Sequence, residues 1–398
     1  MSEMSYLEKL LDGVEVEWLS LSKVFNLRNG YTPSKTKKEF WENGDIPWFR
    51  MDDIRENGRI LGNSLQRISS CAVKGGKLFP ENSILISTSA TIGEHALITV
   101  PHLANQRFTC LALKESYVDC FDIKFLFYYC FSLAEWCRKN TTMSSFASVD
   151  MDGFKKFLIP LPCPDNPEKS LAIQSEIVRI LDKFTALTAE LTAELTMRKK
   201  QYNYYRDQLL SFEEGDVEWK TLGEVAVIGT GNHDTQDAIE HGKYIFYARG
   251  REPLKLNVFD FDETAIITAG DGAGVGKVFH YAKGKYALHQ RAYRIVPNAF
   301  MNPRFVYHYI TAYFFTYIQK ASVSSSVTSL RRPMFLKFPI PVPPSEEQAR
   351  IVEILDKFDT LTNSITEGLP REIELRQKQY EYYRDLLFSF PKPDSVTN

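Results

Sequence analysis

The feature that most constrains this chain is that its sequence contains one unit twice. Four short motifs occur in the same order in both halves. The paired motifs are Val16–Trp18 and Val217–Trp219, Ile159–Pro162 and Ile340–Pro343, Ile180–Phe184 and Ile354–Phe358, and Lys200–Asp207 and Lys378–Asp385. Matches of this length and order are not expected by chance, so the sequence indicates two copies of a globular segment followed by a helical segment.

The start of the chain resembles the junction between the two copies. Residues 6–18 loosely match residues 205–219. The amino terminus would then supply the tail of a repeat whose body lies at the carboxyl end, and we expect the two ends of the chain to lie close together. The alternative interpretation is a generic amphipathic opening helix.

The first helical segment contains neither Gly nor Pro between Glu168 and Glu214. Its apolar and aromatic residues recur at alternating steps of four and three, which is typical of long helices packed as a coiled coil. Such a helix needs a partner, and the second copy, residues 345–390, is the expected one. The side chains predicted to line the contact are Leu181, Phe184, Leu191, Leu195, Tyr202, Tyr205, Leu355, Phe358, Tyr380 and Tyr383.

The second helical segment differs from the first in two ways. Gly368 and Pro370 should kink or break it, because proline removes a backbone donor and clashes with the preceding turn. It is also four residues longer between the shared Phe and the shared Arg, whereas the first segment carries a tandem tetrad, Thr188–Leu191 and Thr192–Leu195. One more tetrad, ~6 Å of helix, would make the two segments equal. We therefore predict that the tetrad adjusts helix length, with a neutral slip in the gene as the alternative origin.

The two globular segments are similar only in outline. Their shared landmarks are a short buried strand (83–88 and 264–269), an aromatic helix lying against a sheet (125–129 and 305–309) and a Ser/Thr-rich loop (141–148 and 322–329). These landmarks favour one mixed domain that is built twice, and the predicted fold class is α+β (mixed α/β). The predicted boundaries are 1–13 for an N-terminal helix, 14–158 for the first domain, 159–214 for the central long helix, 215–338 for the second domain and 339–398 for the C-terminal long helix.

The net charge of −2, from 48 basic and 50 acidic residues, conceals an uneven distribution. Residues 14–158 carry 18 basic and 16 acidic side chains, and residues 216–338 carry 15 and 11. The helical segments are acidic, with 7 basic and 8 acidic side chains in 165–213 and 7 and 11 in 344–398. Two mildly basic domains joined by acidic helices permit contacts to phosphate, although ordinary solvated surface is the alternative.

The composition also limits the class of protein. No run of ~18 apolar residues suggests a membrane span, and the first residues do not form a secretory signal. The six cysteines form no CxxC pair, which argues against a zinc site or a disulfide framework. We expect a cytoplasmic protein that binds no metal.

No catalytic motif is complete. The glycine-rich stretch Gly270–Lys277 fails as a P-loop because Asp271 replaces the first Gly and Val278 replaces the Ser or Thr that holds magnesium. A turn between strands is the better interpretation. The sequence also lacks HExxH, GxSxG, an S-adenosylmethionine loop and the Asn/Asp-Pro-Pro-aromatic tetrapeptide of amino-methyltransferases. The chain is predicted to be non-catalytic and to bind no cofactor itself.

Candidate DNA contacts come from basic and amide side chains, because Arg and Lys hold phosphates while Arg, Asn and Gln read base edges. Gln106 and Gln290, each followed by Arg, occupy equivalent places in the two copies. The candidates in the first domain are Lys35, Lys37, Lys38, Arg50, Asn105, Gln106 and Arg107. Those in the second domain are Arg249, Arg251, Lys277, His289, Gln290, Arg291, Arg331 and Arg332.

Over its whole length the chain resembles the DNA-specificity subunits of type I restriction–modification enzymes, most closely the type IC branch. The resemblance is carried by ILDKFTALTAELTAEL and RKKQYNYYRDQLLSF, by their second copies, and by GYTPSK with the stretch Phe40–Trp48. It implies two target-recognition domains, each reading one half of an asymmetric bipartite DNA sequence. Antiparallel helices would place the domains about a pseudo-twofold axis, in a cyclic arrangement that matches the dyad of duplex DNA.

The resemblance also implies partners. The helices would set the spacing between half-sites and dock two modification subunits, which use S-adenosylmethionine to methylate adenine N6. Motor–nuclease subunits, which use ATP and magnesium, would complete a restriction endonuclease. Two other hypotheses remain: a free-standing pseudodimeric DNA-binding regulator, and a self-contained methyltransferase or nuclease with unrecognised motifs.

Overall fold

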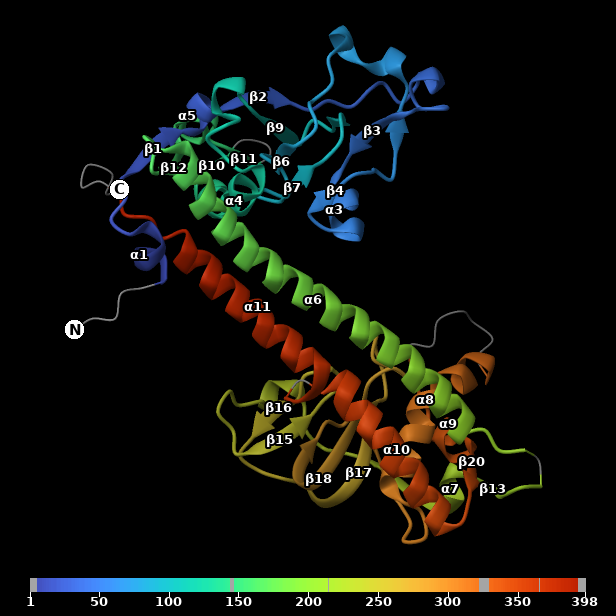
Figure 1. Cartoon of the computed structure of the whole chain (residues 1–398). Coiled ribbons are helices and arrows are strands. Elements are labelled where there is room, and N and C mark those ends of the chain that lie inside the picture. The colour runs from blue at the N-terminus through green and yellow to red at the C-terminus, as the bar shows by residue number, and fades with distance from the viewer. Residues whose placement is uncertain (1–5, 144–146, 214, 322–328, 365, 393–398) are drawn as a thin grey trace. The chain divides into compact units, whose positions relative to one another are not determined.

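A computed structural model describes residues 6–143, 147–213, 215–321, 329–364 and 366–392 (Figure 1). The chain divides into two compact units. The first unit contains residues up to 189 together with those from 375 onward, and the second contains residues 190–374. Each unit combines one globular domain with portions of both long helical segments.

The first unit is built on a five-stranded sheet with the strand order β2-β9-β6-β7-β4. The strands β6 (Ser83–Ser87) and β7 (His95–Ile98) are buried along their whole length, as their runs of Ile, Leu and Ala require. A three-stranded sheet, β5-β3-β8, adjoins it with a separate apolar core. The other strands are β2 (Phe25–Asn29), β3 (Ile46–Phe49), β4 (Ile60–Leu61), β5 (Arg67–Ile68), β8 (Leu103–Ala104), β9 (Phe108–Leu113), β10 (Thr141–Met143) and β11 (Ala147–Val149).

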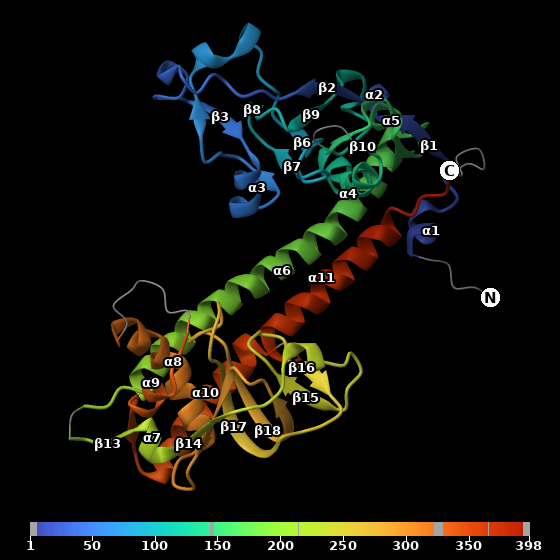
Figure 2. The same ribbon diagram turned by 180° about the vertical axis from the view of Figure 1, so that it is seen from behind.

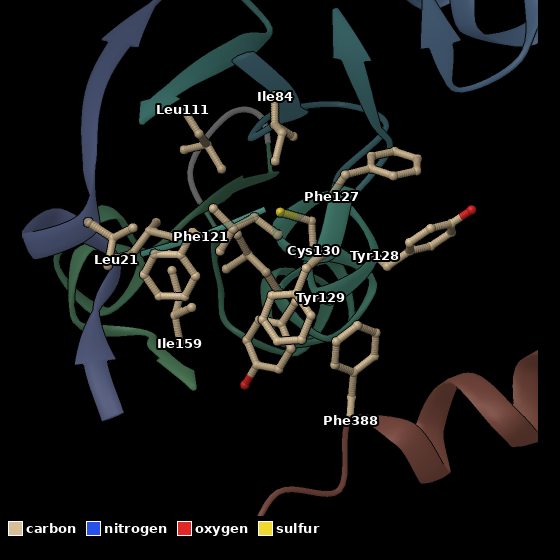
Figure 3. Close-up of a cluster of buried hydrophobic side chains, with 14 of the residues drawn as sticks. Leu21, Ile84, Leu111, Phe121, Phe127, Tyr128, Tyr129, Cys130, Ile159 and Phe388 are labelled. Atoms are coloured by element: carbon tan, nitrogen blue, oxygen red, sulfur yellow. The ribbon is translucent and has the colours of Figure 1, made fainter. Parts of the chain in front are cut away.

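The helix α4 (Ile123–Lys139) packs on β6 and β7 and supplies Phe125, Phe127, Tyr128 and Tyr129 to the main core. In Figure 3 its residues Phe127 and Cys130 point toward the side of the sheet, whereas Tyr128 and Tyr129 point away from the sheet residues Ile84 and Leu111. All of these side chains belong to one core, which also contains Leu21, Phe121 and Ile159. The expected aromatic helix lying against a sheet is therefore confirmed. The remaining helices of this domain are α2 (Leu21–Val24), α3 (Met51–Asn57) and α5 (Met151–Lys156), with short 3-10 turns at Lys38–Phe40, Ser70–Ala72, Lys74–Gly76 and Glu115–Tyr117.

The second unit has a six-stranded sheet with the order β14-β19-β17-β18-β15-β16. The helix α8 (Pro303–Ala321) packs on β17 and β19, as α4 packs on its own sheet. The predicted strand at 264–269 forms the buried end of a longer strand, β17 (Phe261–Ala269). The other elements are β13 (Glu218–Thr221), α7 (Leu222–Val225), β14 (Ala226–Thr230), the 3-10 turn Thr235–Asp237, β15 (Tyr244–Tyr247), β16 (Leu254–Leu256), β18 (Phe279–Leu288), β19 (Ala292–Pro297), α9 (Arg332–Leu336) and β20 (Pro339–Val342).

The repeated motifs make equivalent contacts in the two units. The strand β1 (Val16–Ser20) pairs antiparallel with β12 (Leu158–Pro162), and β13 pairs with β20 in the same way. In both ladders a Trp lies opposite the first Pro of the IPxP motif. The predicted helical segments begin at residues 159 and 339 and so include the two IPxP motifs. In the structure these motifs form strands instead of helix. The first long helix itself, α6 (Pro167–Leu209), begins after its motif.

A buried Gln anchors each long helix to the domain that precedes it. The Gln174 side chain accepts a hydrogen bond from the Asp122 N–H at 2.9 Å and donates to the Cys120 carbonyl at 2.8 Å. Gln348 makes the equivalent bonds, accepting from the Asn302 N–H at 2.7 Å. Because an unpaired buried amide is costly, these bonds dictate how each helix begins against its domain.

An Asp about two turns further along holds the core helix of each domain. Asp182 accepts a hydrogen bond from the Tyr128 hydroxyl at 2.7 Å and pairs with Lys124 at 2.7 Å. In the second unit Asp356 pairs with Arg304 at 2.6 Å. The ring of His308 lies 2.7 Å from the same carboxylate. The repeated ILDKF motif thus carries a conserved ionic anchor whose partners differ.

The two helical segments differ in continuity. The helix α6 is unbroken, whereas the second segment forms α10 (Ser345–Asn363) and α11 (Gly368–Leu387) (Figure 1). Gly368 has φ +74°, and a side chain there would collide with the Thr360 carbonyl oxygen. The predicted break is confirmed. Because α10 ends at Asn363 and α11 begins at Gly368, the four extra residues add no helical turn, and the helical residues between the shared Phe and Arg are equal in number.

The helices pack antiparallel within each unit. In the first unit the start of α6 (Ile173, Ile177, Leu181) shares a core with Leu387 at the end of α11 and with Phe388 just beyond it. In the second unit Tyr202 near the end of α6 and Leu210 just beyond it share a core with Ile351 and Leu355 of α10. Leu181 and Leu355 are fully buried, Phe184, Leu191, Leu195, Tyr202, Phe358 and Tyr380 are half-buried, and Tyr205 and Tyr383 remain 41% and 42% exposed.

The described ends of the chain meet in the first unit, as expected. The helix α1 (Tyr6–Leu11) lies beside the end of α11 in both views (Figures 1 and 2), and Leu7 and Leu11 share a core with Phe388 and Phe390. The Trp18 Nε1–H donates a hydrogen bond to the Pro391 carbonyl at 3.0 Å. The helix α1 and the end of the described chain therefore belong to one core.

Candidate nucleic-acid interface

A tight turn in the first domain presents two polar side chains to solvent. The turn, Asn105–Arg107, lies between β8 and β9. The Asn105 N–H donates a hydrogen bond to the Phe49 carbonyl at 3.1 Å, and the Arg107 N–H donates to Asn105 Oδ1 at 3.0 Å. These bonds occupy the half-buried Asn105 and leave Gln106 and Arg107 exposed.

The second domain contains the same turn at His289–Arg291, between β18 and β19. The His289 N–H donates to the Tyr247 carbonyl at 3.0 Å, and the Arg291 N–H donates to His289 Nδ1 at 2.9 Å. The His289 side chain is 1% exposed, and burial lowers its pKa, so the ring stays neutral and able to accept this bond. His289, expected as a DNA contact, has this structural role instead, whereas Gln290 and Arg291 are exposed.

A glycine lies behind each turn. A side chain at Gly30 would collide with the Asn105 carbonyl oxygen, and one at Gly231 would collide with that of Leu288. The residues that follow each glycine then hold the turn's Gln: Thr32 donates a hydrogen bond to Gln106, and Gln290 donates to Asp234 at 3.0 Å. Both Gln side chains are thus held by the segment after the glycine, Gln106 through its amide oxygen and Gln290 through its amide nitrogen.

A cavity of about 820 Å³ opens beside the first turn. Six of the seven candidates of this domain line it: Lys35, Lys38, Arg50, Asn105, Gln106 and Arg107. Lys37 does not line it and instead lies over the Phe40 ring at 5.0 Å. The wall includes Trp41 and the buried Trp48, whose rings meet edge to face at 5.1 Å. The Arg50 guanidinium lies 5.8 Å from the Trp48 ring and 3.8 Å from Asp52.

Several lining residues escaped the sequence analysis, namely Thr32, Arg55, Gln66 and Thr91. Thr32 follows the glycine behind the turn, so its position could have been inferred from the turn itself. The other three come from separate elements, and no local pattern marks them.

A smaller cavity of about 680 Å³ lies in the second domain and is lined by Arg249, Arg251 and Lys277. The glycine-rich stretch Gly270–Lys277 forms its wall as the connection between β17 and β18, which confirms the turn interpretation. The exposed Arg331 and Arg332 do not line it and lie at the start of α9.

Asp271 joins two of the predicted arginines. It lies 2.9 Å from Arg249 and 3.1 Å from Arg291. Burial acts to raise the pKa of Asp271, but its hydrogen bonds and ion pairs with these two arginines outweigh burial and hold the pKa below its ordinary value. The carboxylate therefore stays charged and fixes two guanidinium groups beside the turn.

The equivalent position in the first domain is Ser89. The backbone bridges Ser89–Ser148 and Asp271–Ser329 correspond. In the first domain the N–H of Thr88, the residue before the bridge, donates a hydrogen bond to the Arg107 carbonyl. In the second domain the Gly270 N–H donates to the Arg291 carbonyl in the same way. Arg107 thus has a neutral neighbour where Arg291 has a carboxylate. Ser148 and Ser329 end the predicted Ser/Thr-rich loops, of which residues 144–146 and 322–328 lie outside the described residues.

Three further observations bear on the class of protein. Across the described ranges, no group of three or more His, Cys, Asp or Glu residues is arranged to hold a metal ion. No helix in the part of the chain that the structure describes is long and apolar enough to cross a bilayer. All six cysteines are unpaired.

Comparison with known proteins identifies the family. The sequence matches the model of the type I restriction modification DNA specificity domain twice, over residues 13–197 and 214–375. The chain therefore belongs to this family. It is a DNA target-specificity subunit of a type I restriction–modification system, and as such is itself non-catalytic.

Individual relatives agree with this assignment. The chain is 67% identical to the EcoprrI specificity subunit of Escherichia coli, over 92% of this chain and 93% of the relative. It is 41% identical to the EcoR124I/EcoR124II specificity subunit of Escherichia coli over the whole of both chains, in agreement with the type IC resemblance. The crystal structure of an S subunit from M. genitalium matches with a TM-score of 0.59 at 17% identity, covering 98% of this chain and all of that one, which shows a shared fold.

Proposed function

We propose that each globular domain reads one half of an asymmetric bipartite DNA target through its exposed Gln-Arg turn and the cavity beside it. The observation that carries this proposal is the construction of one turn twice, by Asn105 in one domain and by His289 in the other, with Gln and Arg exposed in both. Gln pairs with adenine and Arg with guanine through two hydrogen bonds in the major groove.

The surroundings of the two turns differ, so the two half-sites should differ. The first domain offers a larger cavity that is lined by two Trp residues. It also has Ser89 at the position equivalent to Asp271. The second offers a smaller cavity with Arg249 and Arg291 fixed by Asp271. Lys35, Lys38, Arg251 and Lys277 would contact phosphate, and Lys37, Arg331 and Arg332 remain candidate backbone contacts outside the two cavities.

The long helices would dock two modification subunits and set the spacing of the half-sites about a pseudo-twofold axis. Support comes from a duplicated aromatic surface: Tyr204 and Tyr382, at equivalent places in the two repeats, are 62% and 64% exposed. Exposed Tyr is enriched where proteins bind one another. The modification subunits would use S-adenosylmethionine, and restriction subunits joining the same cytoplasmic complex would use ATP and magnesium.

Mapping of methylated sites tests the division of labour. The Gln106→Ala/Arg107→Ala variant, expressed with its modification subunits, should lose selectivity in the first half-site and keep the second. Gln290→Ala/Arg291→Ala should do the reverse. If both variants methylate the unchanged target, the turns do not read DNA. Selective binding by the isolated chain, equal to that of the complex, would favour a free-standing regulator instead.

A further inference from the structure

A second cavity in the first domain continues the recognition cavity. Its volume is about 670 Å³, and it shares Met51, Arg55 and Thr91 with the cavity beside the Gln106–Arg107 turn. Because three residues line both, the two hollows form one concave track along the face of the domain. No candidate from the sequence analysis lies in the second cavity.

Three arginines line this second cavity, which we call the arginine groove: Arg55 of α3, Arg59 just before β4, and Arg138 at the end of α4. Arg59 is held by Glu94 at 2.7 Å and by the His95 carbonyl at 3.1 Å. Arg55 and Arg138 are exposed and have no carboxylate partner among the described residues. Their positive charge is therefore available to an external anion.

The charge of the whole track differs from that of its domain. The residues lining the two cavities include seven Lys or Arg and three Asp or Glu. The domain as a whole is nearly balanced, with 18 basic and 16 acidic side chains. Positive charge is thus concentrated along the concave face, as a polyanion requires.

A buried hydroxyl lies where the two cavities meet. Thr91 Oγ1 is inaccessible to solvent and has no hydrogen-bond partner among the described residues. A buried polar atom without a partner is unusual, but an atom that solvent does not reach is not itself a phosphate contact. The groove lining contains no Asn or Gln, the amide side chains that pair with adenine.

We infer that the arginine groove binds the phosphodiester backbone of the same DNA whose bases meet the Gln106–Arg107 turn. Arg55 and Arg138 would contact phosphate, and Arg59 would stiffen the wall through Glu94. This inference rests on the proposed function and extends it, because it separates a backbone-holding segment of the track from its base-reading segment.

Salt dependence of DNA binding distinguishes these two roles. The Arg55→Ala/Arg138→Ala variant, assembled with its modification subunits, should bind cognate and non-cognate duplexes more weakly by a similar factor. The slope of log K against log salt should become shallower by about 0.9 for each lost phosphate contact, or about 2 in total. The methylated sequence should not change.

The control is Lys155→Ala/Lys156→Ala, which removes the same charge from exposed positions on α5 that line neither cavity. It should leave the slope near that of the unmodified chain, and thermal unfolding confirms that each variant folds. An unchanged slope for Arg55→Ala/Arg138→Ala would overturn the inference, and so would an altered methylation sequence. The proposed function would survive either result if Gln106→Ala/Arg107→Ala still changed the first half-site.

Discussion

Phe184 stacks on Tyr383, with ring centroids 5.4 Å apart and planes at 25°. Phe358 stacks on Tyr205 in the same manner, at 5.6 Å and 28°. In each stack the Phe comes from the ILDKF motif of one repeat and the Tyr from the YYRD motif of the other. Each repeat therefore supplies half of both contacts, which explains why these motifs remain nearly identical while the domains have diverged.

The first prediction concerns the coupling within these stacks. Phe184→Ala and Tyr383→Ala should each lower the free energy of unfolding of the first unit. The loss in the double variant should be smaller than the sum of the two single losses by about 0.5–1.5 kcal/mol, the usual energy of an aromatic pair. Urea denaturation of the four proteins of the cycle measures this difference. Phe184→Ala with Tyr205→Ala is the matched control, because these two rings belong to different stacks and should be additive.

The second prediction concerns pH. Burial, together with the charge of Arg59, lowers the pKa of His95 to about 3. The unfolded chain has the ordinary value near 6.5, so between these values protons bind the unfolded state preferentially. The stability of the first unit should therefore fall as the pH drops below ~6.5, by up to ~1.4 kcal/mol per pH unit from this residue. His95→Gln should flatten the profile between pH 6.5 and 5 in urea denaturation; an equally steep profile would contradict this assignment.

The third prediction exchanges the equivalent residues Ser89 and Asp271. Asp271→Ser frees Arg249 and Arg291, so selectivity at one position of the second half-site should fall ~10–100-fold, the value of one good base contact. Ser89→Asp should alter the first half-site alone. Methylation mapping measures both variants, and a change in both half-sites from either single substitution would refute local reading.

The fourth prediction concerns subunit docking. Tyr204→Ala should remove one modification subunit from the complex and Tyr382→Ala the other, because a buried Tyr anchor contributes on the order of 2 kcal/mol, or ~30-fold in affinity. Native mass spectrometry counts the subunits. Met197→Ala, at a position of α6 that is 54% exposed, serves as the control. Two retained subunits in the Tyr204→Ala/Tyr382→Ala variant would exclude this surface.

The fifth prediction concerns spacing. Deletion of Thr192–Leu195 should shorten the spacer of the DNA target by one to two base pairs, because it removes ~6 Å of helix and base pairs are ~3.4 Å apart. Both half-sites should stay intact. Sequencing of methylated sites measures the spacer length and both half-sites. Altered half-sites with an unchanged spacer would contradict the prediction that helix length sets the spacer.

The sequence revealed those parts of the fold that use the same contact twice. The ILDKF and YYRD motifs were visible because Phe184 and Phe358 need identical partners, and the turns were aligned because Gln106 and Gln290 are both followed by Arg. The role of His289 was not predictable, since its ring replaces the Asn105 amide as an acceptor and is buried against Phe246. The arginine groove was also invisible, because α3, α4 and the segment between them meet only in the folded domain.

The break before Gly368 has a consequence for how the two helical segments can change length. In the unbroken α6 each inserted residue rotates everything beyond it by ~100°, whereas four residues rotate it by ~400°, only ~40° from its original direction. Four residues are therefore the smallest insertion that nearly preserves the direction in which each face of the helix points beyond the insertion. The second segment is different, because α10 ends at Asn363 and α11 begins at Gly368, so no continuous helix connects them. An insertion between these two helices is therefore not restricted to steps of four residues.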